Sequence, residues 1–240
     1  MSTTKPEVAE STSKVRRRMP DVAPLLGFLI LLTVFFTITS EYFLDLDNFK
    51  NIFVALAVTG VVCVPGTMLM IAGQVDLSVG SSAAVSGMIL GNVVNSYGIA
   101  NGLLAVLVYG LVIGAINGFF VTVIGVNSLI TTLGTLATLY GIALLIGNGQ
   151  TLMMKNFEWL GTAQPAGIPL PILIFFVIAV VGIITLRRTR FGRSLYAIGS
   201  NPNAARVVGI RSNRILFATF VLSGLSSALA GAILCSQLSA

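Results

Sequence analysis

Long apolar runs, separated by short polar segments, dominate the chain. The runs approach or exceed about 18 residues, the length at which a helix begins to cross the hydrocarbon core of a bilayer. Inside a bilayer every backbone polar group needs an internal partner, which a helix supplies. The pattern therefore predicts an all-α, polytopic transmembrane helical bundle. About seven spans are expected, at residues 22–40, 51–72, 79–96, 99–124, 128–146, 169–186 and 214–236.

Positive charges fall almost entirely into two blocks of the sequence. Five of the 14 Lys and Arg residues precede residue 19, seven lie between residues 187 and 214, and the other two are Lys50 and Lys155. Cytoplasmic segments carry an excess of Lys and Arg, so both blocks are expected on the cytoplasmic side, with the N-terminus cytoplasmic. We therefore expect a disordered basic tail at 1–19 and a transmembrane domain at 20–240, with a cytoplasmic loop at 187–213.

The composition narrows the function classes. Only 9% of the residues are charged, whereas soluble domains carry about a quarter charged residues. The net charge of +6 lies beside apolar runs, which favours membrane orientation and lipid contact over nucleic-acid binding. Cys63 and Cys235 sit inside apolar runs and the sequence has no His, so we expect free thiols and no metal site. Since no Walker A or Gly-x-Ser-x-Gly motif occurs, the sequence predicts no enzyme activity and no cofactor.

Small residues recur at every fourth position in two of the expected spans. Such stripes allow helix backbones to approach closely in lipid. We therefore expect these faces to make helix contacts. The two stripes are Gly110, Gly114 and Gly118 in the fourth span, and Gly224, Ala228 and Ala232 in the seventh.

Two polar features interrupt the apolar pattern. Asp76 precedes the third span, where an Asp suits the N-cap; the alternative is a polar contact along a translocation path. Thr131, Thr135 and Thr138 share one face of the fifth span. Threonines in membrane helices often bond to their own backbone, yet with Asn117 nearby these hydroxyls would also suit a neutral polyhydroxylated solute. Both alternatives stay open for each feature.

The second basic block contains the pattern of a short helix outside the membrane. Asn201 suits its N-cap, Pro202 its first turn and Gly209 the position just past its end. A helix of about two turns is far shorter than the ~20 residues needed to cross hydrocarbon. It is either a connector that caps the bundle or the place where a soluble partner delivers mechanical work.

Three motifs follow one another in the sequence, at residues 73–81, 129–135 and 189–210. In the same order they resemble motifs of the sugar-importing ABC permeases for ribose, arabinose, xylose and autoinducer-2. Residues 73–81 are similar to the Gly-Gly-Ile-Asp-Leu-Ser-Val-Gly-Ser motif of that family, with Gln74 in place of the second glycine. Residues 129–135 resemble its Val/Leu-Ile-Thr-Leu-Gly-Thr stretch, and residues 189–210 resemble its cytoplasmic loop. Members of that family continue with further spans, so the chain looks truncated at its C-terminus.

The resemblance implies a permease subunit of a bacterial inner-membrane importer. Its implied partners are ATP-binding cassette subunits, which hydrolyse the ATP, a periplasmic sugar-binding protein, and a second permease copy or paralogue. With the resemblance, the short helix becomes a coupling helix that docks on the ATPase. The expected pathway residues are Asp76, Gln74, Asn117, Thr131 and Thr135, and the expected coupling residues are Asn201, Ala204, Ala205, Arg206 and Gly209.

Two other function classes remain alternatives. A gradient-driven sugar carrier or facilitator usually needs ionisable groups inside the membrane, and Asp76 at a span boundary gives it weak support. A membrane scaffold that transports nothing is the other. Co-purification of an ATPase would separate the ATP-driven importer from both, and an effect of uncouplers at constant ATP would favour the gradient-driven carrier.

Overall fold

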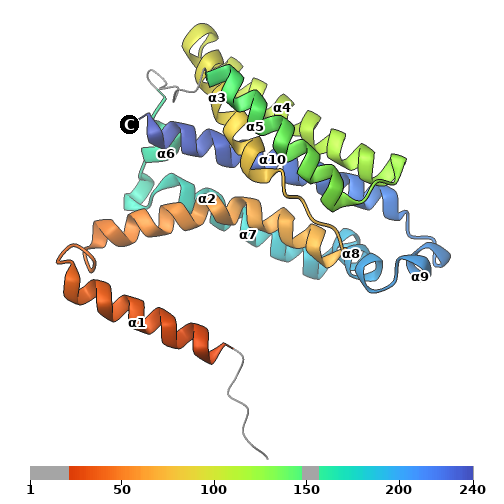
Figure 1. The fold of residues 1–240 in the computed structure, drawn as a ribbon, viewed down its shortest axis with the longest axis horizontal. Helices are drawn as coiled ribbons and strands as arrows, with labels where there is room; N and C mark the ends of the chain where they lie inside the picture. The colour runs from red at the N-terminus through yellow and green to blue at the C-terminus, as the bar shows by residue number, and fades with distance from the viewer. Residues whose placement is uncertain (1–21, 148–156, 240) are drawn as a thin grey trace, which may run out of the picture. The chain divides into compact units, whose positions relative to one another are not determined.

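The computed structural model describes residues 22–147 and 157–239, and throughout these residues it contains helices, turns and connecting segments without a strand (Figure 1). The all-α prediction is therefore confirmed. The expected tail at 1–19 and Lys155 lie outside the described residues. The chain divides into two units, residues 1–49 and 50–240, and each is described by itself.

The first unit contains α1 (Ala23–Thr39) and the start of α2 (Leu46–Ile71). Pro24 lies in the first turn of α1, where its missing N–H costs no intrahelical hydrogen bond. In the turn that follows, the Phe43 ring stacks on Phe36 at a centroid distance of 5.6 Å. Asn48 Nδ2 donates to the Phe43 carbonyl at 2.8 Å, which fixes the entry into α2.

The second unit contains the remaining helices. Their bounds are α3 (Val79–Tyr97), α4 (Ile99–Phe119), η1 (Phe120–Ile124), α5 (Ser128–Gly147), α6 (Trp159–Thr162), η2 (Pro165–Gly167), α7 (Leu170–Arg188), α8 (Arg190–Ser200), α9 (Pro202–Val207) and α10 (Ser212–Leu238).

The seven expected spans can be compared with these helices. Each span coincides with one of α1, α2, α3, α4 with η1, α5, α7 and α10. Five of the described helices (α2, α4 with η1, α5, α7 and α10) are long and apolar enough to cross a membrane, whereas α1 is shorter and α3 is richer in Ser and Asn. The number of spans therefore stays a prediction.

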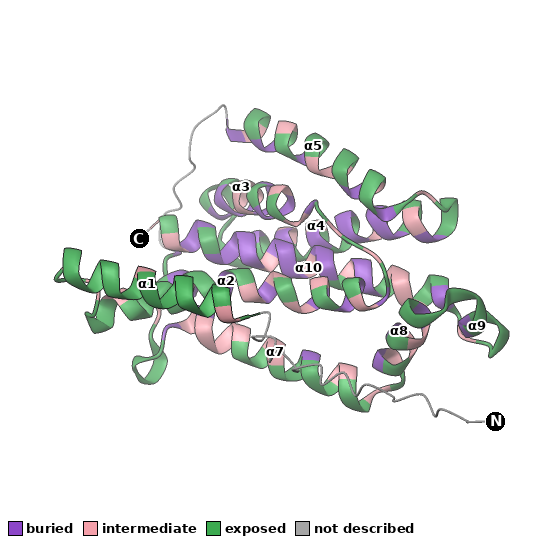
Figure 2. Ribbon diagram, turned by 60° about the horizontal axis from the view of Figure 1, so that its bottom comes forward, coloured by how far each residue is buried: buried purple, intermediate pink, exposed green. Residues whose placement is uncertain are grey.

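α10 lies at the centre of the second unit, with α3 and α4 packed along it (Figures 1 and 2). The small-residue stripes form this contact, as predicted. A Cβ on Gly110 would lie 2.8 Å from the Ala228 Cβ, and one on Gly114 would lie 2.7 Å from the Val221 Cα. The two backbones are therefore too close for any side chain larger than hydrogen at these glycines.

A second hydrophobic cluster joins the end of α2 to α8 and α9. Met68 and Ala72 pack with Leu195, Ile198 and Ala205. α8 was not predicted from the sequence; it is amphipathic and buries residues three positions apart along one face. The Thr189 hydroxyl accepts a hydrogen bond from the Gly192 N–H at 3.2 Å and so caps its first turn. Through this packing α8 fixes the place of α9 at one end of the bundle.

Candidate functional site

A non-helical segment at residues 74–77 separates α2 from α3 and carries Asp76. Gly73, with φ of +75°, ends α2 in the left-handed conformation that glycine adopts without strain. The Gln74 N–H donates to the Leu69 carbonyl at 2.9 Å, and the Val75 N–H donates to the Ser128 hydroxyl of α5 at 3.4 Å. The segment is thus tied both to the helix before it and to a helix far along the chain.

Asp76 links this segment to α10. Its Oδ1 accepts hydrogen bonds from the Ser78 N–H at 3.0 Å and from the Ser78 hydroxyl at 2.6 Å, and its Oδ2 accepts one from the Ser223 hydroxyl at 2.7 Å. The expectation that Asp76 is the N-cap of α3 is wrong, because Ser78 occupies that position. The carboxylate instead joins the local turn to a distant helix, and its contact with a translocation path stays a prediction.

Asn117 of α4 extends this arrangement to α5. Its Nδ2 donates to the Ser78 hydroxyl at 2.9 Å, and its Oδ1 accepts from the Thr135 hydroxyl at 2.6 Å. Asn117 is only 1% exposed, so both hydrogen bonds are formed away from solvent. We refer to Asp76, Ser78, Asn117, Thr135 and Ser223 as the Asp76 cluster. Three of the predicted pathway residues, Asp76, Asn117 and Thr135, therefore meet in one hydrogen-bonded group.

A row of serines continues the polar contact between α3 and α10. The Ser227 hydroxyl donates to the Ser82 hydroxyl at 2.9 Å, and Tyr109 of α4 donates to the same oxygen at 3.3 Å. Ser86 donates to the Ala228 carbonyl at 2.6 Å. Sequence reasoning missed these serines and Ser223, and their signal was the four-residue spacing of Ser82 with Ser86 and of Ser223 with Ser227 on facing helices.

The other threonines of α5 have different roles. Thr132 and Thr138 donate to the carbonyls four residues before them, which is the backbone bonding considered above. The Thr131 hydroxyl is buried and has no hydrogen-bond partner among the described residues. Thr131 therefore stands apart from the Asp76 cluster, although it lies one turn from Thr135.

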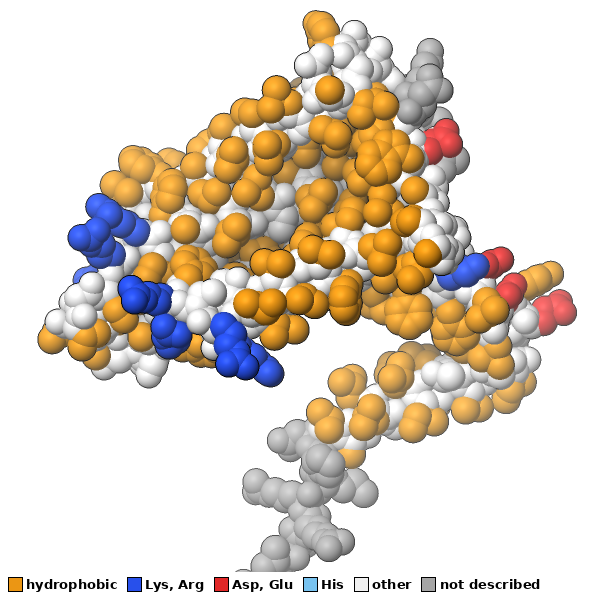
Figure 3. Space-filling model, turned by 180° about the vertical axis from the view of Figure 1, so that it is seen from behind, with side chains coloured by type: hydrophobic (Ala, Val, Ile, Leu, Met, Phe, Trp, Pro, Cys, Tyr) orange, Lys and Arg blue, Asp and Glu red, His pale blue; other side chains and the backbone are white. Residues whose placement is uncertain are grey.

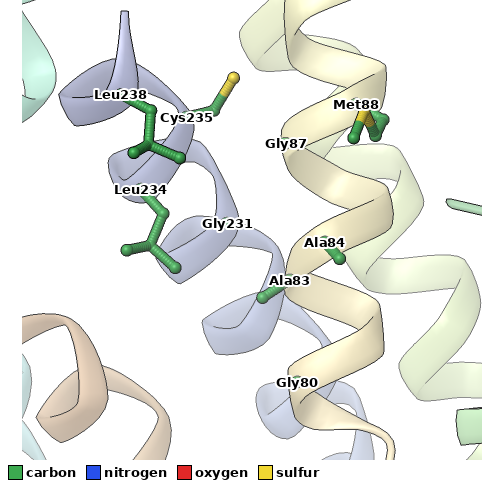
Figure 4. A pocket seen from close by; sticks show the side chains of 9 residues that line it. All are labelled: Gly80, Ala83, Ala84, Gly87, Met88, Gly231, Leu234, Cys235 and Leu238. Atoms are coloured by element: carbon green, nitrogen blue, oxygen red, sulfur yellow. The ribbon is translucent and has the colours of Figure 1, made fainter. Parts of the chain in front are cut away.

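Gln74 is not part of the Asp76 cluster. It lines a cavity of about 350 Å³ together with Pro202 and Arg206, and we call this the Arg206 cavity. A separate groove of about 310 Å³ lies between α3 and α10, where Ala83, Met88 and Leu234 contribute to an almost wholly apolar lining (Figure 4). The groove offers few hydrogen-bonding groups, so it suits acyl chains or helix side chains rather than a polar solute.

The short helix α9 has the ends that the sequence predicted. The Asn201 Oδ1 accepts from the N–H groups of Asn203 and Ala204 at 3.1 and 3.0 Å, and Gly209 follows the helix with φ of +82°. Ala205 is buried, whereas Val207 and Val208 are 87% and 74% exposed.

These placements divide the residues of α9 and its C-terminal end into two groups. Ala205 anchors α9 to the protein, and the valines face outward. Ala204 and Arg206 are also exposed. Arginine side chains gather at this end of the second unit (Figure 3).

Among residues 22–147 and 157–239 there is no group of three His, Cys, Asp or Glu side chains that could hold a metal ion. The Asp76 cluster consists of hydroxyls and an amide around one carboxylate. Such groups can form hydrogen bonds with a polar solute.

Comparisons with known proteins agree on one family. The family model described as "Branched-chain amino acid transport system / permease component" matches residues 48–240. A ribose import permease of Escherichia coli (strain K12) is 33% identical over 224 residues, which cover 90% of this chain and 69% of that protein.

Two further relatives carry other sugar names. An L-arabinose ABC transporter permease of Azospirillum brasilense is 31% identical over 244 residues, covering 98% of this chain and 71% of that protein. A D-allose transport system permease of Escherichia coli (strain K12) is 32% identical over 217 residues, covering 88% and 66%. No solved structure matches the chain.

Proposed function

The chain belongs to the ABC transporter permease family that includes the ribose, allose and arabinose permeases, and we propose that it forms the membrane pathway of an ATP-driven sugar importer. The observation that carries the proposal is the Asp76 cluster, whose polar side chains are all neutral except that of Asp76. The cluster lies where α3, α4, α5 and α10 meet, in a unit made largely of apolar helices. A polyhydroxylated solute needs hydrogen bonds and no counter-charge, which hydroxyls and amides supply.

The pathway runs along the Asp76 cluster, with Thr131 as a further contact. The unpartnered Thr131 hydroxyl is one turn from Thr135, so a solute hydroxyl that reached both would satisfy a polar group now buried without a partner. The solute would reach Gln74 after the Asp76 cluster, at the end of the second unit where α9 lies.

The variant Asp76→Asn tests this pathway. Asn replaces one carboxylate oxygen with an NH₂ group that cannot accept, so the hydroxyl of Ser78 or of Ser223 can no longer donate to that position. We expect sugar uptake to fall several-fold while the membrane level of the protein stays normal. Thr138→Val, which removes only a backbone-directed hydroxyl on an exposed face, should keep wild-type uptake.

Unchanged uptake in Asp76→Asn would exclude Asp76 from the pathway. The energy source is measured in the same cells with an uncoupler at constant ATP. An ATP-driven importer keeps its uptake under this treatment, whereas a gradient-driven carrier loses it.

We further propose that α9 is the coupling helix that docks on an ATP-binding cassette subunit. An exposed pair of valines outside the membrane leaves apolar surface in water, which a docking partner would cover. Arg206 on the same short helix offers a charged anchor, with Ala204 beside it. Asn201 and Gly209 shape the helix ends, and the buried Ala205 holds α9 to the bundle so that its motion is transmitted.

The double variant Val207→Glu/Val208→Glu tests docking. Burying unpaired charges in an interface is costly, so we expect loss of ATPase co-purification and of uptake at normal membrane levels. Tyr196→Glu on α8, also an exposed site, is the matched control and should keep the ATPase. A glutamate at Ala205 is unsuitable because it would disrupt the packing of α9 itself. Retention of the ATPase by the double variant would make α9 a bundle cap only.

The proposed setting is the bacterial inner membrane, with the permease paired with a second copy or a paralogue and served by a periplasmic sugar-binding protein. Residues 20–240 form the permease domain and residues 187–213 its cytoplasmic coupling loop. A reporter fused after Arg193 should give a cytoplasmic signal. A periplasmic signal there would overturn the topology and with it the coupling role of α9.

A further inference from the structure

The Arg206 cavity differs in its chemistry from the groove between α3 and α10. Polar side chains supply much of its wall, whereas the α3–α10 groove is nearly all apolar. Its lining comes from four places: the segment after α2, the η1–α5 junction, the α8–α9 region and the start of α10. Seven of the lining residues carry polar or charged side chains that can donate a hydrogen bond: Gln74, Thr122, Asn127, Ser128, Arg206, Ser212 and Asn213.

The cavity is built for negative charge. Arg206 supplies a full positive charge, and no Asp or Glu lies among the described residues that line the wall. The first residues of α5 and α10, Ser128 and Ser212, also line it, so the N-terminal ends of two long helices face the space. Helix N-termini carry partial positive charge and attract anions.

Ser212 supplies an independent sign of a missing ligand. The residue is only 4% exposed, and its hydroxyl has no hydrogen-bond partner among the described residues. A buried hydroxyl without a partner is costly, so such groups usually mark the place of a bound water, ion or ligand. Ser212 is among the residues that line the Arg206 cavity.

Neighbouring hydrogen bonds hold the other donors in place. Asn213 Nδ2 donates to the Thr122 carbonyl at 2.7 Å, which fixes the start of α10 against η1. The Asn127 Oδ1 accepts from the Leu129 N–H at 2.9 Å, so its acceptor end is occupied and its Nδ2 donor end is turned away from that bond. These two bonds hold Asn127 and Asn213 in place on the wall of the cavity.

We propose that the Arg206 cavity binds a phosphate group, supplied either by a free phosphate anion or by the headgroup of an anionic phospholipid. A phosphate has several acceptor oxygens, which match a guanidinium, a hydroxyl and amides converging from different elements. The volume of about 350 Å³ holds a phosphate together with part of the group attached to it. Bound there, the phosphate ties α9 to the starts of α5 and α10 and so restrains the position of α9.

The test uses the purified full chain in detergent, after lipid removal. Wild-type protein is titrated with inorganic phosphate against chloride at equal ionic strength, and binding is followed by calorimetry and by the thermal midpoint. At tenfold excess over the dissociation constant we expect the midpoint to rise by about 3 °C. In a second arm, phosphatidylglycerol is added back to the same protein, and native mass spectrometry counts the lipid molecules that it retains.

Two variants and one control make the test specific. Arg206→Gln should lower the affinity for the phosphate group at least tenfold. Ser212→Ala should lower it several-fold without lowering the midpoint of the ligand-free protein, because it removes a hydroxyl that has no partner. Arg193→Gln removes an exposed arginine of α8 that does not line the cavity, and it should bind like wild type.

Binding of inorganic phosphate that depends on Arg206 assigns the site to a free anion, and retention of phosphatidylglycerol alone with the same dependence assigns it to a lipid headgroup. If neither ligand binds, or if Arg193→Gln weakens binding as much as Arg206→Gln, the proposal is overturned. The readout is binding to the isolated permease, so its result is independent of ATPase docking and sugar uptake.

Discussion

α7 and α10 are both long apolar helices, yet they are used in opposite ways. α7 is the more hydrophobic of the two, but only 11% of its most apolar 18-residue window is buried, against 56% for α10. Figure 2 shows that α10 is largely buried and α7 largely exposed. The difference lies in residue size and polarity, because α10 buries Gly, Ala and Ser whereas α7 exposes large aliphatic residues. In lipid, hydrophobicity does not distinguish the inside of a protein from its surroundings, and small residues mark the contacts.

The largest effect is expected from enlarging the contact between α10 and α4. A Cβ on Gly224 would meet the Gly110 carbonyl and lie 2.6 Å from the Gly114 N, so Gly224→Val forces the two backbones apart. Overpacking of this kind costs about 3 kcal/mol, and we expect a strongly lowered thermal midpoint in detergent. Gly134→Val on α5 is the control, since a Cβ at that position would have no neighbouring atom within 4 Å. Equal losses in the two variants would contradict the comparison.

A matched pair of truncations sharpens the contrast between the two helices. Ile233 of α10 is fully buried, and Ile184 of α7 is 52% exposed. Ile233→Ala leaves a cavity and should cost about 2 kcal/mol, at the low end for core truncations because lipid replaces water as the solvent. Ile184→Ala should change the stability by less than about 0.5 kcal/mol. A larger loss for Ile184 would show that another surface covers α7.

The smallest effect concerns one hydrogen bond across the α3–α10 contact. Ser86→Ala removes the bond to the Ala228 carbonyl and should cost about 1 kcal/mol, measured as a shift of the thermal midpoint. Ser194→Ala on α8 removes a hydroxyl that bonds only to its own helix at the Arg190 carbonyl, and it should be close to neutral. A neutral Ser86→Ala would mean that apolar packing alone holds α3 to α10.

Some of the Asp76 cluster could be anticipated and some could not. Asp76, Asn117 and Thr135 stand out as polar residues at the edges or faces of apolar runs, which is a local property of the sequence. Ser223 bonds to Asp76 from 147 positions away, and it is one of many serines in the chain. The pairing depends on how α10 is rotated against the segment before α3, and no local pattern encodes that rotation.

What the sequence by itself determined follows from local chemistry. The length of the apolar runs placed the long helices, the small-residue stripes marked where α4 and α10 meet, and Asn201 and Gly209 marked the ends of α9, because capping and backbone freedom act within a few residues. Only the tertiary structure decided that Ala205 faces inward while Val207 faces outward, and that Gln74 lies with Arg206 apart from Asp76. Those outcomes depend on which face of each helix meets a neighbour. In an apolar chain hydropathy carries little information about that choice, since a lipid tail and a leucine are equally apolar neighbours.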